Sequence, residues 1–441
     1  MFGELKSLSS DGAGFGQSRG RAVWHGVIAL STVLAVLVVA LGAVLTWLGV
    51  RGAAWQLALT PFYNVATSEP AGTLINQEPL TAFWAPVQVP GARAFRIVYA
   101  TQRPDGSAAV SGGMVFVPDG PPPPGGRPIL AWAHPTLGQG PGCAPSRSGS
   151  PLGDMQTWLQ QAIDRGWVVV ATDYAGLGTP GPTLYLVGEA EARDIVNAVR
   201  AARELVPDEV GTRYAVWGHS QGGHAALWTA HLGPELATEL DLQGVAAAAP
   251  AAKLNDIITL QWESAESWLL GPEIMESWPV SYSTINDSQL SVAGRLLGPL
   301  INNACLVRGA LMAKAFTGLG LRYLQENPIR DPAWARIATL QEPGPVSADV
   351  PVLIGQSLAD ETVFAWPNGR LQAQWCDAGS KVSTIWISVA SHMATADTIS
   401  PTAMQWIGDR FANRPDLAAC VTPPLVQSAE EQAQLAAGTD V

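Results

Sequence analysis

The stretch that decides the fold is Arg213–His231, RYAVWGHSQGGHAALWTAH. It begins with an apolar, β-prone run, continues with the pentapeptide Gly218-His219-Ser220-Gln221-Gly222, and ends in an alanine-rich segment with helical spacing. A strand, a sharp turn and a helix form the context in which a G-x-S-x-G motif makes a nucleophile elbow. The glycines are needed because side chains two residues either side of the serine would collide with backbone. We therefore expect Ser220 at the tip of the turn, at a helix N-terminus that favours negative charge.

A second copy of the motif, Gly16-Gln17-Ser18-Arg19-Gly20, lies near the N-terminus. No β-prone run precedes Ser18, and residues 1–21 are rich in glycine and serine. Such a composition is typical of a disordered tail, which is the structure we predict for residues 1–21. The context therefore favours Ser220 over Ser18 as the reactive serine.

Around the elbow, apolar runs of strand length alternate with segments of helical spacing. The predicted strands are 95–101, 108–118, 129–134, 168–172, 214–217, 245–249, 351–356 and 382–388, and the predicted helices are 154–165, 188–205, 371–378 and 399–412. This alternation predicts an α/β fold with a mostly parallel central sheet covered by helices on both faces. Reactive groups should then lie at the carboxyl ends of the strands.

The composition excludes several classes of protein. With 47% hydrophobic residues and 17 tryptophans among 441 residues, the chain can bury a large core, which excludes global disorder. A net charge of −12 and the lack of a Lys/Arg cluster argue against nucleic acid as a partner. The sequence has neither C-x-x-C nor H-E-x-x-H spacing, so we expect no protein-bound metal.

One motif suggests a nucleotide site, and its context argues against one. Residues 176–181 fit G-x-G-x-x-G and follow a predicted strand. In a dinucleotide site the third glycine lies at the start of a helix, whereas Pro182 and a non-helical stretch follow here. We therefore expect no nucleotide, and we interpret this segment as a loop that borders the active site.

Residues 22–50 contain a segment long enough to cross a membrane. Val27 to Val50 carries no charge and, as a helix, would extend about 36 Å against a bilayer core of about 30 Å. The alternative is a cleaved signal peptide ending near Gly52-Ala53-Ala54, but the apolar part of a signal is usually only about 7–15 residues long. We favour an uncleaved anchor. Three basic residues precede this segment, Lys6, Arg19 and Arg21, and only Arg51 closely follows it. The excess of positive charge before the segment predicts a cytoplasmic N-terminus and an extracytoplasmic remainder.

The reactive serine needs a base and an acid, which follow it in the order Ser, Asp or Glu, His on this scaffold. Among the histidines after Ser220, His392 is the one that has candidate acids and a further strand between it and the serine. We place His392 in a loop after strand 382–388. Asp360 follows the carboxyl end of strand 351–356 and would orient the imidazole. Glu361 is the alternative acid.

An oxyanion hole needs two donors near the serine. The backbone N–H of Gln221, directly after the nucleophile, is the first. The second should come from the loop after strand 129–134, where Pro135 has no N–H and Thr136 is the best candidate. The Thr136 hydroxyl could add a further donor.

Several motifs together carry a family resemblance. They are PAGTLI at 70–75, RIVYATQRPDGSAAVSGGMVFVP at 96–118, AWAHPTLG at 131–138, CAPS at 143–146, DYAGLGTPG at 173–181 and WGHSQGG at 217–223. With Asp360 and His392 they resemble the secretory lipases of the α/β-hydrolase type over about residues 60–420. The resemblance implies lipase or carboxylesterase activity, a helical cap before the acid-bearing strand, and no cofactor. The chain differs in having His134-Pro135-Thr136 where many members have His-Gly-Thr, and in its long apolar segment.

Four cysteines, an even number, fit an oxidising exterior, but the residues alone allow three pairings. The family resemblance implies the pairs Cys143–Cys305 and Cys376–Cys420.

The segment 255–336 is helix-prone and interrupts the strand–helix alternation. An insertion on the carboxyl side of the sheet should lie over the active site. Its large apolar residues could line a pocket for acyl chains or only pack the insertion onto the core. These residues are Trp262, Trp268, Leu269, Leu270, Met275, Trp278, Leu311, Met312, Phe316 and Leu319.

Together these patterns predict a chain in six parts: a tail (1–21), an anchor or signal (22–50), a first core part (51–254), a helical cap (255–345), a second core part (346–420) and a flexible tail (421–441). The predicted function is that of an extracytoplasmic serine hydrolase acting on lipid or other apolar esters. The alternatives are a peptidase on the same fold and a catalytically silent surface binding protein.

Overall fold

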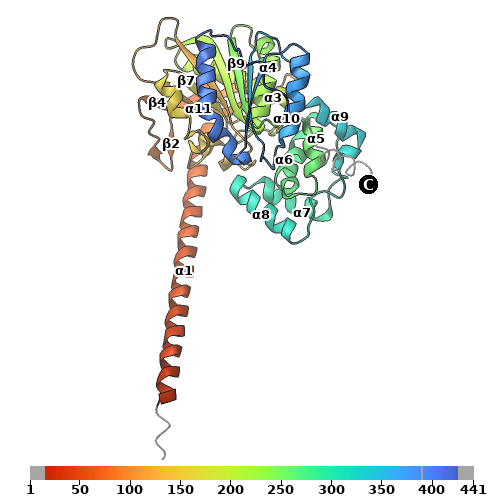
Figure 1. Cartoon of the computed structure of the whole chain (residues 1–441). Helices are drawn as coiled ribbons and strands as arrows, with labels where there is room; N and C mark the ends of the chain where they lie inside the picture. Colours follow the sequence, from red (N-terminus) through yellow and green to blue (C-terminus); the bar gives the residue numbers. More distant parts are fainter. Residues whose placement is uncertain (1–14, 389–390, 426–441) are drawn as a thin grey trace, which may run out of the picture. The chain divides into compact units, whose positions relative to one another are not determined.

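A computed structural model describes residues 15–388 and 391–425 of the chain (Figure 1). The chain divides into two compact units, Met1–Ala58 and Leu59–Val441, which are described separately.

Helix α1 spans Phe15–Tyr63. Within it, Val36–Tyr63 is long and apolar enough to cross a membrane, by length and composition only. The helix is longer than the predicted anchor or signal of residues 22–50, because residues 15–21 are helical rather than disordered and the helix continues through residues 51–63, which we assigned to the first core part. Pro61 is the only proline between these bounds, and the alanines and leucines around it favour helix, which explains the extension. Ser18 lies inside this helix, and residues 1–14 of the predicted tail lie outside the described residues.

The second unit is built on a nine-stranded sheet in the order β1-β4-β5-β7-β6-β8-β9-β10-β11. The strands are β1 (Leu74–Pro79), β4 (Ala92–Gln102), β5 (Ala108–Pro118), β6 (Arg127–Ala133), β7 (Val168–Thr172), β8 (Val210–His219), β9 (Asp241–Ala248), β10 (Val352–Ser357) and β11 (Val382–Ile387). The pairs β1–β4, β4–β5 and β5–β7 are antiparallel, and every pair from β7 to β11 is parallel. A separate small sheet pairs β2 (Thr81–Ala82) with β3 (Ala85–Pro86). The predicted mostly parallel sheet is confirmed.

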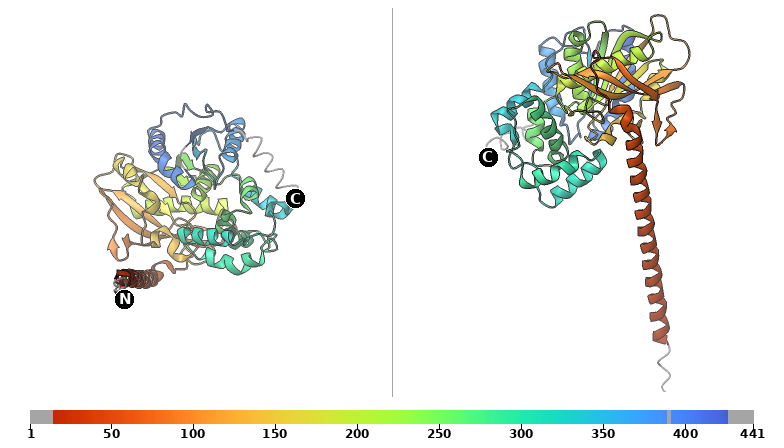
Figure 2. Two further views of the ribbon diagram at one scale, coloured as in Figure 1. Left: turned by 60° about the horizontal axis from the view of Figure 1, so that its bottom comes forward. Right: turned by 180° about the vertical axis from the view of Figure 1, so that it is seen from behind.

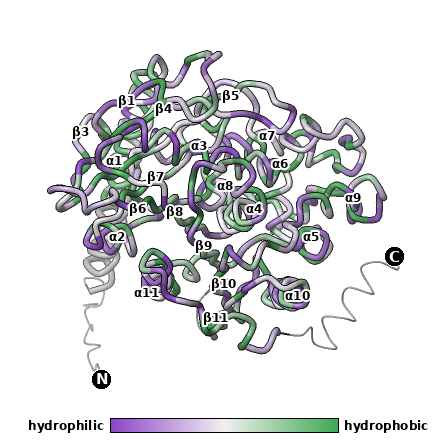
Figure 3. The backbone as a smooth tube through the Cα atoms, turned by 90° about the horizontal axis from the view of Figure 1, so that it is seen from above, coloured by the Kyte–Doolittle hydropathy of each residue, from purple (hydrophilic) through white to green (hydrophobic). Residues whose placement is uncertain are grey.

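Helices cover both faces of this sheet, as Figure 3 shows. Helices α3 (Gly188–Leu205), α4 (Gln221–Leu236) and α10 (Ala365–Asp377) lie on one face, and α2 (Leu159–Asp164) and α11 (His392–Phe411) lie on the other. Each face has its own buried core, one around Val199 and Leu371 and one around Trp158 and Ile399. Because the central strands are buried on both faces, they read as continuous apolar runs in the sequence.

The predicted helix 154–165 is only partly helical. Residues Gly153–Met155 form a 3₁₀ turn, and the α-helix begins at Leu159. The other 3₁₀ turns are Pro141–Cys143, Pro145–Arg147 and Pro328–Arg330.

A cluster of helices, called the cap here, occupies the segment between β9 and β10. It consists of α5 (Leu254–Gln261), α6 (Ala265–Ser281), α7 (Val292–Asn302), α8 (Leu306–Gly318) and α9 (Pro332–Leu340). In Figures 1 and 2 these helices, coloured green to blue-green, form a group beside the sheet. Trp278 packs in a cluster with Tyr185 of the core, whereas Trp268 packs with Tyr323 inside the cap.

Two disulfides tie the fold together. Cys143 pairs with Cys305, which joins the loop after β6 to the N-terminus of α8 in the cap. Cys376 pairs with Cys420, which joins α10 to the segment after α11. The pairing implied by the family resemblance is therefore the one in the structure.

Candidate active site

Ser220 lies in the turn between β8 and α4, with φ 57° and ψ −118°. A non-glycine residue in this region is strained, and such strain is typical of functional turns. A Cβ at Gly218 would overlap the carbonyl oxygen of Gly222, and a Cβ at Gly222 would overlap that of Ala133. The turn therefore requires both glycines of the motif, as the sequence predicts.

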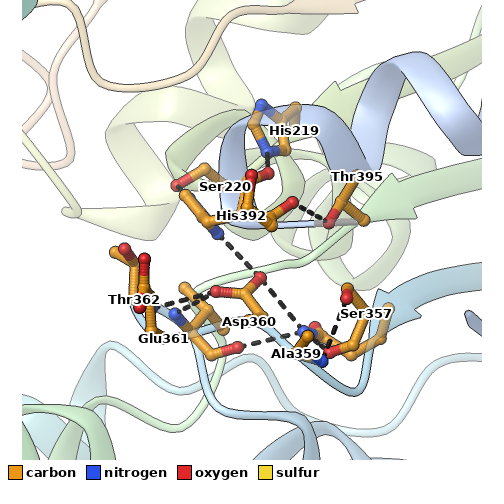
Figure 4. A network of polar contacts seen from close by, with 12 residues as sticks. His219, Ser220, Ser357, Ala359, Asp360, Glu361, Thr362, His392 and Thr395 are labelled. Carbon is orange, nitrogen blue, oxygen red and sulfur yellow. Dashed lines mark hydrogen bonds and ion pairs between the residues drawn. The ribbon is translucent and has the colours of Figure 1, made fainter. Parts of the chain in front are cut away.

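His392 connects Ser220 to Asp360 (Figure 4). Its Nε2 lies 2.9 Å from Ser220 Oγ, and its Nδ1 lies 2.8 Å from Asp360 Oδ2. The structure thus brings together three residues that are far apart in the sequence, in the geometry of a nucleophile, a base and an orienting acid. All three side chains are buried.

The prediction that His392 lies in a loop is wrong, because His392 is the first residue of α11. Ser391 occupies the N-cap position with an extended backbone, at φ −70° and ψ 173°, and the helix starts directly after it. Serine is a preferred N-cap residue, although its side chain makes no capping hydrogen bond here. The imidazole is therefore attached to a helix rather than to a loop.

Asp360 follows the carboxyl end of β10 and is held by the turn after it. Its Oδ1 accepts hydrogen bonds from the backbone N–H groups of Thr362 at 3.0 Å and Val363 at 2.9 Å. Gln356 Nε2 donates to Oδ2 at 3.2 Å. The other candidate acid, Glu361, is exposed and offers its backbone carbonyl to Gln261 instead. Asp360 is accordingly the acid next to His392.

His219 is a neighbour of the site whose role the sequence did not indicate. Its Nε2 lies 3.1 Å from the backbone carbonyl oxygen of His392. Burial, together with the nearby His392, lowers the pKa of His219 to about 3. The ring is therefore neutral at neutral pH, and because a carbonyl only accepts hydrogen bonds, Nε2 carries the proton and donates it.

Of the predicted oxyanion donors, Gln221 directly follows the serine in the chain, and Thr136 belongs to the loop after β6. Gln221 is the first residue of α4, where backbone N–H groups have no partner within the helix. Thr136 lines the same cavity as Ser220 and His392. The Thr136 hydroxyl lies 2.8 Å from the Tyr185 hydroxyl, so it already has a partner within the fold.

Glu191 of α3 fixes the side chain of Gln221 and was also missed in the sequence. The buried carboxylate accepts hydrogen bonds from Gln221 Nε2 at 2.8 Å and from the Leu186 backbone N–H at 3.1 Å, and it lies 2.9 Å from His224 Nδ1. Three donors around one carboxylate compensate for its burial. The first turn of α4 is thus tied to α3 directly beside Ser220.

A cavity of about 480 Å³ extends from Ser220 and His392 into the cap. Its lining is mostly apolar, and the cap contributes Ile257, Ile274 and Leu306 among others. Half of the apolar cap residues named in the sequence line this cavity, namely Trp262, Leu269, Leu270, Met275 and Leu311. Of the others, Trp268 and Trp278 are buried in the packing of the cap, and Leu319 is exposed. The segment therefore lines a cavity with some of these residues and packs the cap with others, and the binding of acyl chains in the cavity stays a prediction.

A second, much smaller cavity of about 30 Å³ is lined by buried acids. It is bordered by Gln221, by Leu177 of the G-x-G-x-x-G segment, and by Glu273 of the cap. Burial raises the pKa of Glu273 to about 8 and that of Asp194 to about 7. The segment 176–181 contains no helix, and α3 begins only at Gly188.

Comparison with known proteins yields one family and a set of related lipases and esterases. Residues 152–419 match the family described as "Secretory lipase". "Lipase 9" of Candida albicans is 27% identical over 312 residues, which are 63% of this chain and 65% of that protein. "Secreted triacylglycerol lipase LIP4" of Malassezia globosa is 26% identical over 297 residues, which are 62% of this chain and 63% of that protein. The match thus spans slightly less than two thirds of the length of these relatives.

The solved structures show the same fold. Candida antarctica lipase A superposes with a TM-score of 0.68 at 19% identity, covering 86% of this chain and 93% of that one. The rice cell wall degrading esterase LipA from Xanthomonas oryzae superposes with a TM-score of 0.64 at 19% identity, covering 79% of this chain and 100% of that one. With the mostly parallel sheet and the elbow after β8, this likeness identifies the fold as an α/β-hydrolase fold.

Proposed function

This chain belongs to the secretory lipase family, and on that premise we propose that it is an extracytoplasmic serine hydrolase that cleaves carboxylic esters of lipids or other apolar compounds. The observation that carries the proposal is the placement of His392 between Ser220 and Asp360 at the end of an apolar cavity. An apolar cavity that meets a few convergent polar groups is the usual form of a site for an apolar substrate.

In the proposed reaction, Ser220 Oγ attacks the ester carbonyl carbon while His392 Nε2 takes the hydroxyl proton. Asp360 stabilises the imidazolium that forms. The backbone N–H groups of Gln221 and Thr136 would stabilise the negative charge on the carbonyl oxygen. His392 then gives its proton to the departing alkoxide, which leaves as an alcohol, and the acyl group remains on Ser220.

A water molecule completes the proposed cycle. His392 takes a proton from the water as the water oxygen attacks the acyl carbon. The bond to Ser220 Oγ breaks, the proton passes from His392 to Oγ, and the carboxylic acid is released. No cofactor takes part in any of these steps.

Labelling with a fluorophosphonate probe tests the proposal. We expect the probe to label Ser220 in the wild type and not to label the Ser220→Ala variant. The labelled wild type should no longer hydrolyse p-nitrophenyl esters. A catalytically silent binding protein would not be labelled. A peptidase would be labelled but would cleave a peptide series faster than an ester series, and either result would contradict the proposal.

The location of the site is part of the proposal. We propose that α1 either anchors the chain in a membrane, with the hydrolase unit outside the cytoplasm, or is removed as a signal. Family membership and the apolar segment within α1 support both versions. N-terminal sequencing of the mature protein separates them, because removal of a signal would give an N-terminus close to residue 54.

A further inference from the structure

The loop after β6, which carries Thr136, lies against two different parts of the fold. At its start it contacts the nucleophile turn, because a Cβ at Gly222 would overlap the carbonyl oxygens of Ala133 and His134. Thr136 itself lines the cavity that contains Ser220. The sheet therefore holds the first residues of this loop, and contacts further along the loop hold the rest.

Two backbone hydrogen bonds join the loop to the turn between α7 and α8 of the cap. The N–H of Leu306 donates to the carbonyl oxygen of Leu137 at 2.9 Å, and the N–H of Gln139 donates to that of Asn302 at 3.1 Å. Leu137 directly follows Thr136 in the chain. The peptide group next to Thr136 is thus bonded to the cap and not to the sheet.

Two glycines allow the loop to approach this turn, residues 302–306, which we call the cap turn. A Cβ at Gly138, where φ is 90°, would overlap the carbonyl oxygen of Ala304. A Cβ at Gly140 would overlap that of Asn303. Any other residue at these two positions would push the loop away from the cap turn, so the close approach requires glycine.

A disulfide adds a covalent bond to the same contact. Cys143 of the loop pairs with Cys305 of the cap turn, which is the N-cap residue of α8 and directly precedes Leu306. The loop and the cap turn are therefore held together by hydrogen bonds, by close backbone packing and by a covalent bond. A loop fixed in this way moves only together with the cap turn.

We propose that the cap turn positions the backbone N–H of Thr136 for the oxyanion. Oxyanion donors stabilise the transition state only if they are held in place before the charge develops. Since Leu137 is bonded to the cap, a displaced cap turn would carry the N–H of Thr136 out of place. The cap would then contribute to the hydrolysis of every ester, including short ones. The proposal rests on the proposed function, and Gly138 is a positioning residue because it acts through Thr136.

Gly138→Ala, compared with Gly320→Ala, tests the proposal. Gly320 has φ 74°, and no atom of the described residues lies within 4 Å of a Cβ added there, so its variant has similar backbone strain without a collision. Gly138→Ala should lower kcat by about 10- to 100-fold, part of the about 10²–10³-fold that an oxyanion donor contributes. Acetate and long-chain p-nitrophenyl esters should be affected equally, with little change in KM. Gly320→Ala should leave these rates unchanged.

Removal of the disulfide tests the same contact without adding a side chain. Cys143→Ser combined with Cys305→Ser should also lower kcat, but by less than Gly138→Ala, because the two backbone hydrogen bonds remain. Cys376→Ser combined with Cys420→Ser removes the other disulfide and is the matched control, which should keep the wild-type kcat. All rates are measured well below the thermal unfolding midpoint of each variant.

Decyl trifluoromethyl ketone separates positioning of the donor from a general distortion of the site. Ser220 Oγ adds to its carbonyl carbon, the hydroxyl proton passes to His392, and the carbonyl oxygen becomes an oxyanion. In Gly138→Ala the affinity for this ketone should fall by the same factor as kcat. The affinity for the corresponding alcohol, which forms no oxyanion, should not change.

Two results would overturn the positioning role while the proposed function stands. One is a wild-type kcat in folded Gly138→Ala, and the other is an equal loss of affinity for the ketone and for the alcohol. A wild type that neither hydrolyses esters nor binds the ketone would overturn both proposals. If Gly138→Ala does not fold, the two disulfide variants decide the question by the same measurements.

Discussion

His219 Nε2 lies 3.1 Å from the backbone carbonyl oxygen of His392. This contact joins the residue before the nucleophile to the residue that would act as its base. It connects the last residue of β8 to the first residue of α11, two elements from distant parts of the chain. The position of the His392 imidazole therefore depends on β8 as well as on Asp360.

Replacing His219 should impair catalysis without affecting substrate binding. In His219→Phe the carbonyl of His392 loses its donor, and one such hydrogen bond contributes about 1 kcal/mol. We expect kcat to fall by about 5- to 10-fold with little change in KM. His219→Gln, which keeps an N–H donor, should recover most of the rate. If both variants are equally slow, or if KM alone changes, His219 does not position His392.

The triad itself predicts much larger effects. Ser220→Ala should lower kcat on the order of 10⁶-fold, and His392→Ala by a similar factor. Asp360→Asn should cost less, since the serine and the base remain. Ser18→Ala, within α1, is the matched control for the second copy of the motif and should have no effect. The four variants are compared by their rates of hydrolysis of a p-nitrophenyl ester. Activity retained by Ser220→Ala would contradict the assignment of the nucleophile.

Glu273 should make the stability of the fold depend on pH. Burial raises its pKa to about 8, above the value of 4.5 that it has in the unfolded chain. The folded protein therefore holds a proton that the unfolded chain loses, and the free energy of unfolding falls as the pH rises from about 4.5 to about 8. Glu273→Gln cannot ionise and avoids this loss.

Thermal unfolding of the two proteins at several pH values checks this expectation. At pH 5 the wild type and Glu273→Gln should have similar melting temperatures. At pH 9 the variant should be more stable, on the order of a few kcal/mol. Glu276→Gln, on the same helix, is the control and should show no such gain. A constant difference between wild type and Glu273→Gln at all pH values would show that Glu273 does not titrate as described.

Eight of the nine strands of the sheet could be predicted because their sequence signals are local, whereas the edge strand β1 was not predicted. The helix Gly188–Leu205 has the predicted bounds, and the run 168–172 is a strand throughout. Ser220 followed from its motif, and Asp360 and His392 followed from their order along the chain. The strands, the helix and the motif each needed one local segment, and the assignment of Asp360 and His392 needed only the order of the segments along the chain.

The remaining features depend on contacts between distant segments. The partner of His219 is a carbonyl of α11, and the partner of Glu191 is a side chain of α4, so neither role is visible in the local sequence. In the cap, Trp268 packs inside while its neighbours Leu269 and Leu270 line the cavity. Helical spacing shows that such residues are buried, but not which surface they meet.

If the cavity holds the acyl chain, residues that line it should affect how kcat/KM depends on acyl length. Residues that only pack the cap should not. Leu270 lines the cavity, whereas Leu297 of α7 packs within the cap and does not line it. Each buried methylene is worth about 0.8 kcal/mol, so lost contact with about four carbons of a chain lowers the rate by roughly 10²-fold. Leu270→Ala should therefore lower kcat/KM for a long-chain p-nitrophenyl ester by up to that factor relative to the acetate ester. Leu297→Ala, the matched control, should change the two esters by the same factor, and an equal change in Leu270→Ala would show that the cavity does not hold the acyl chain.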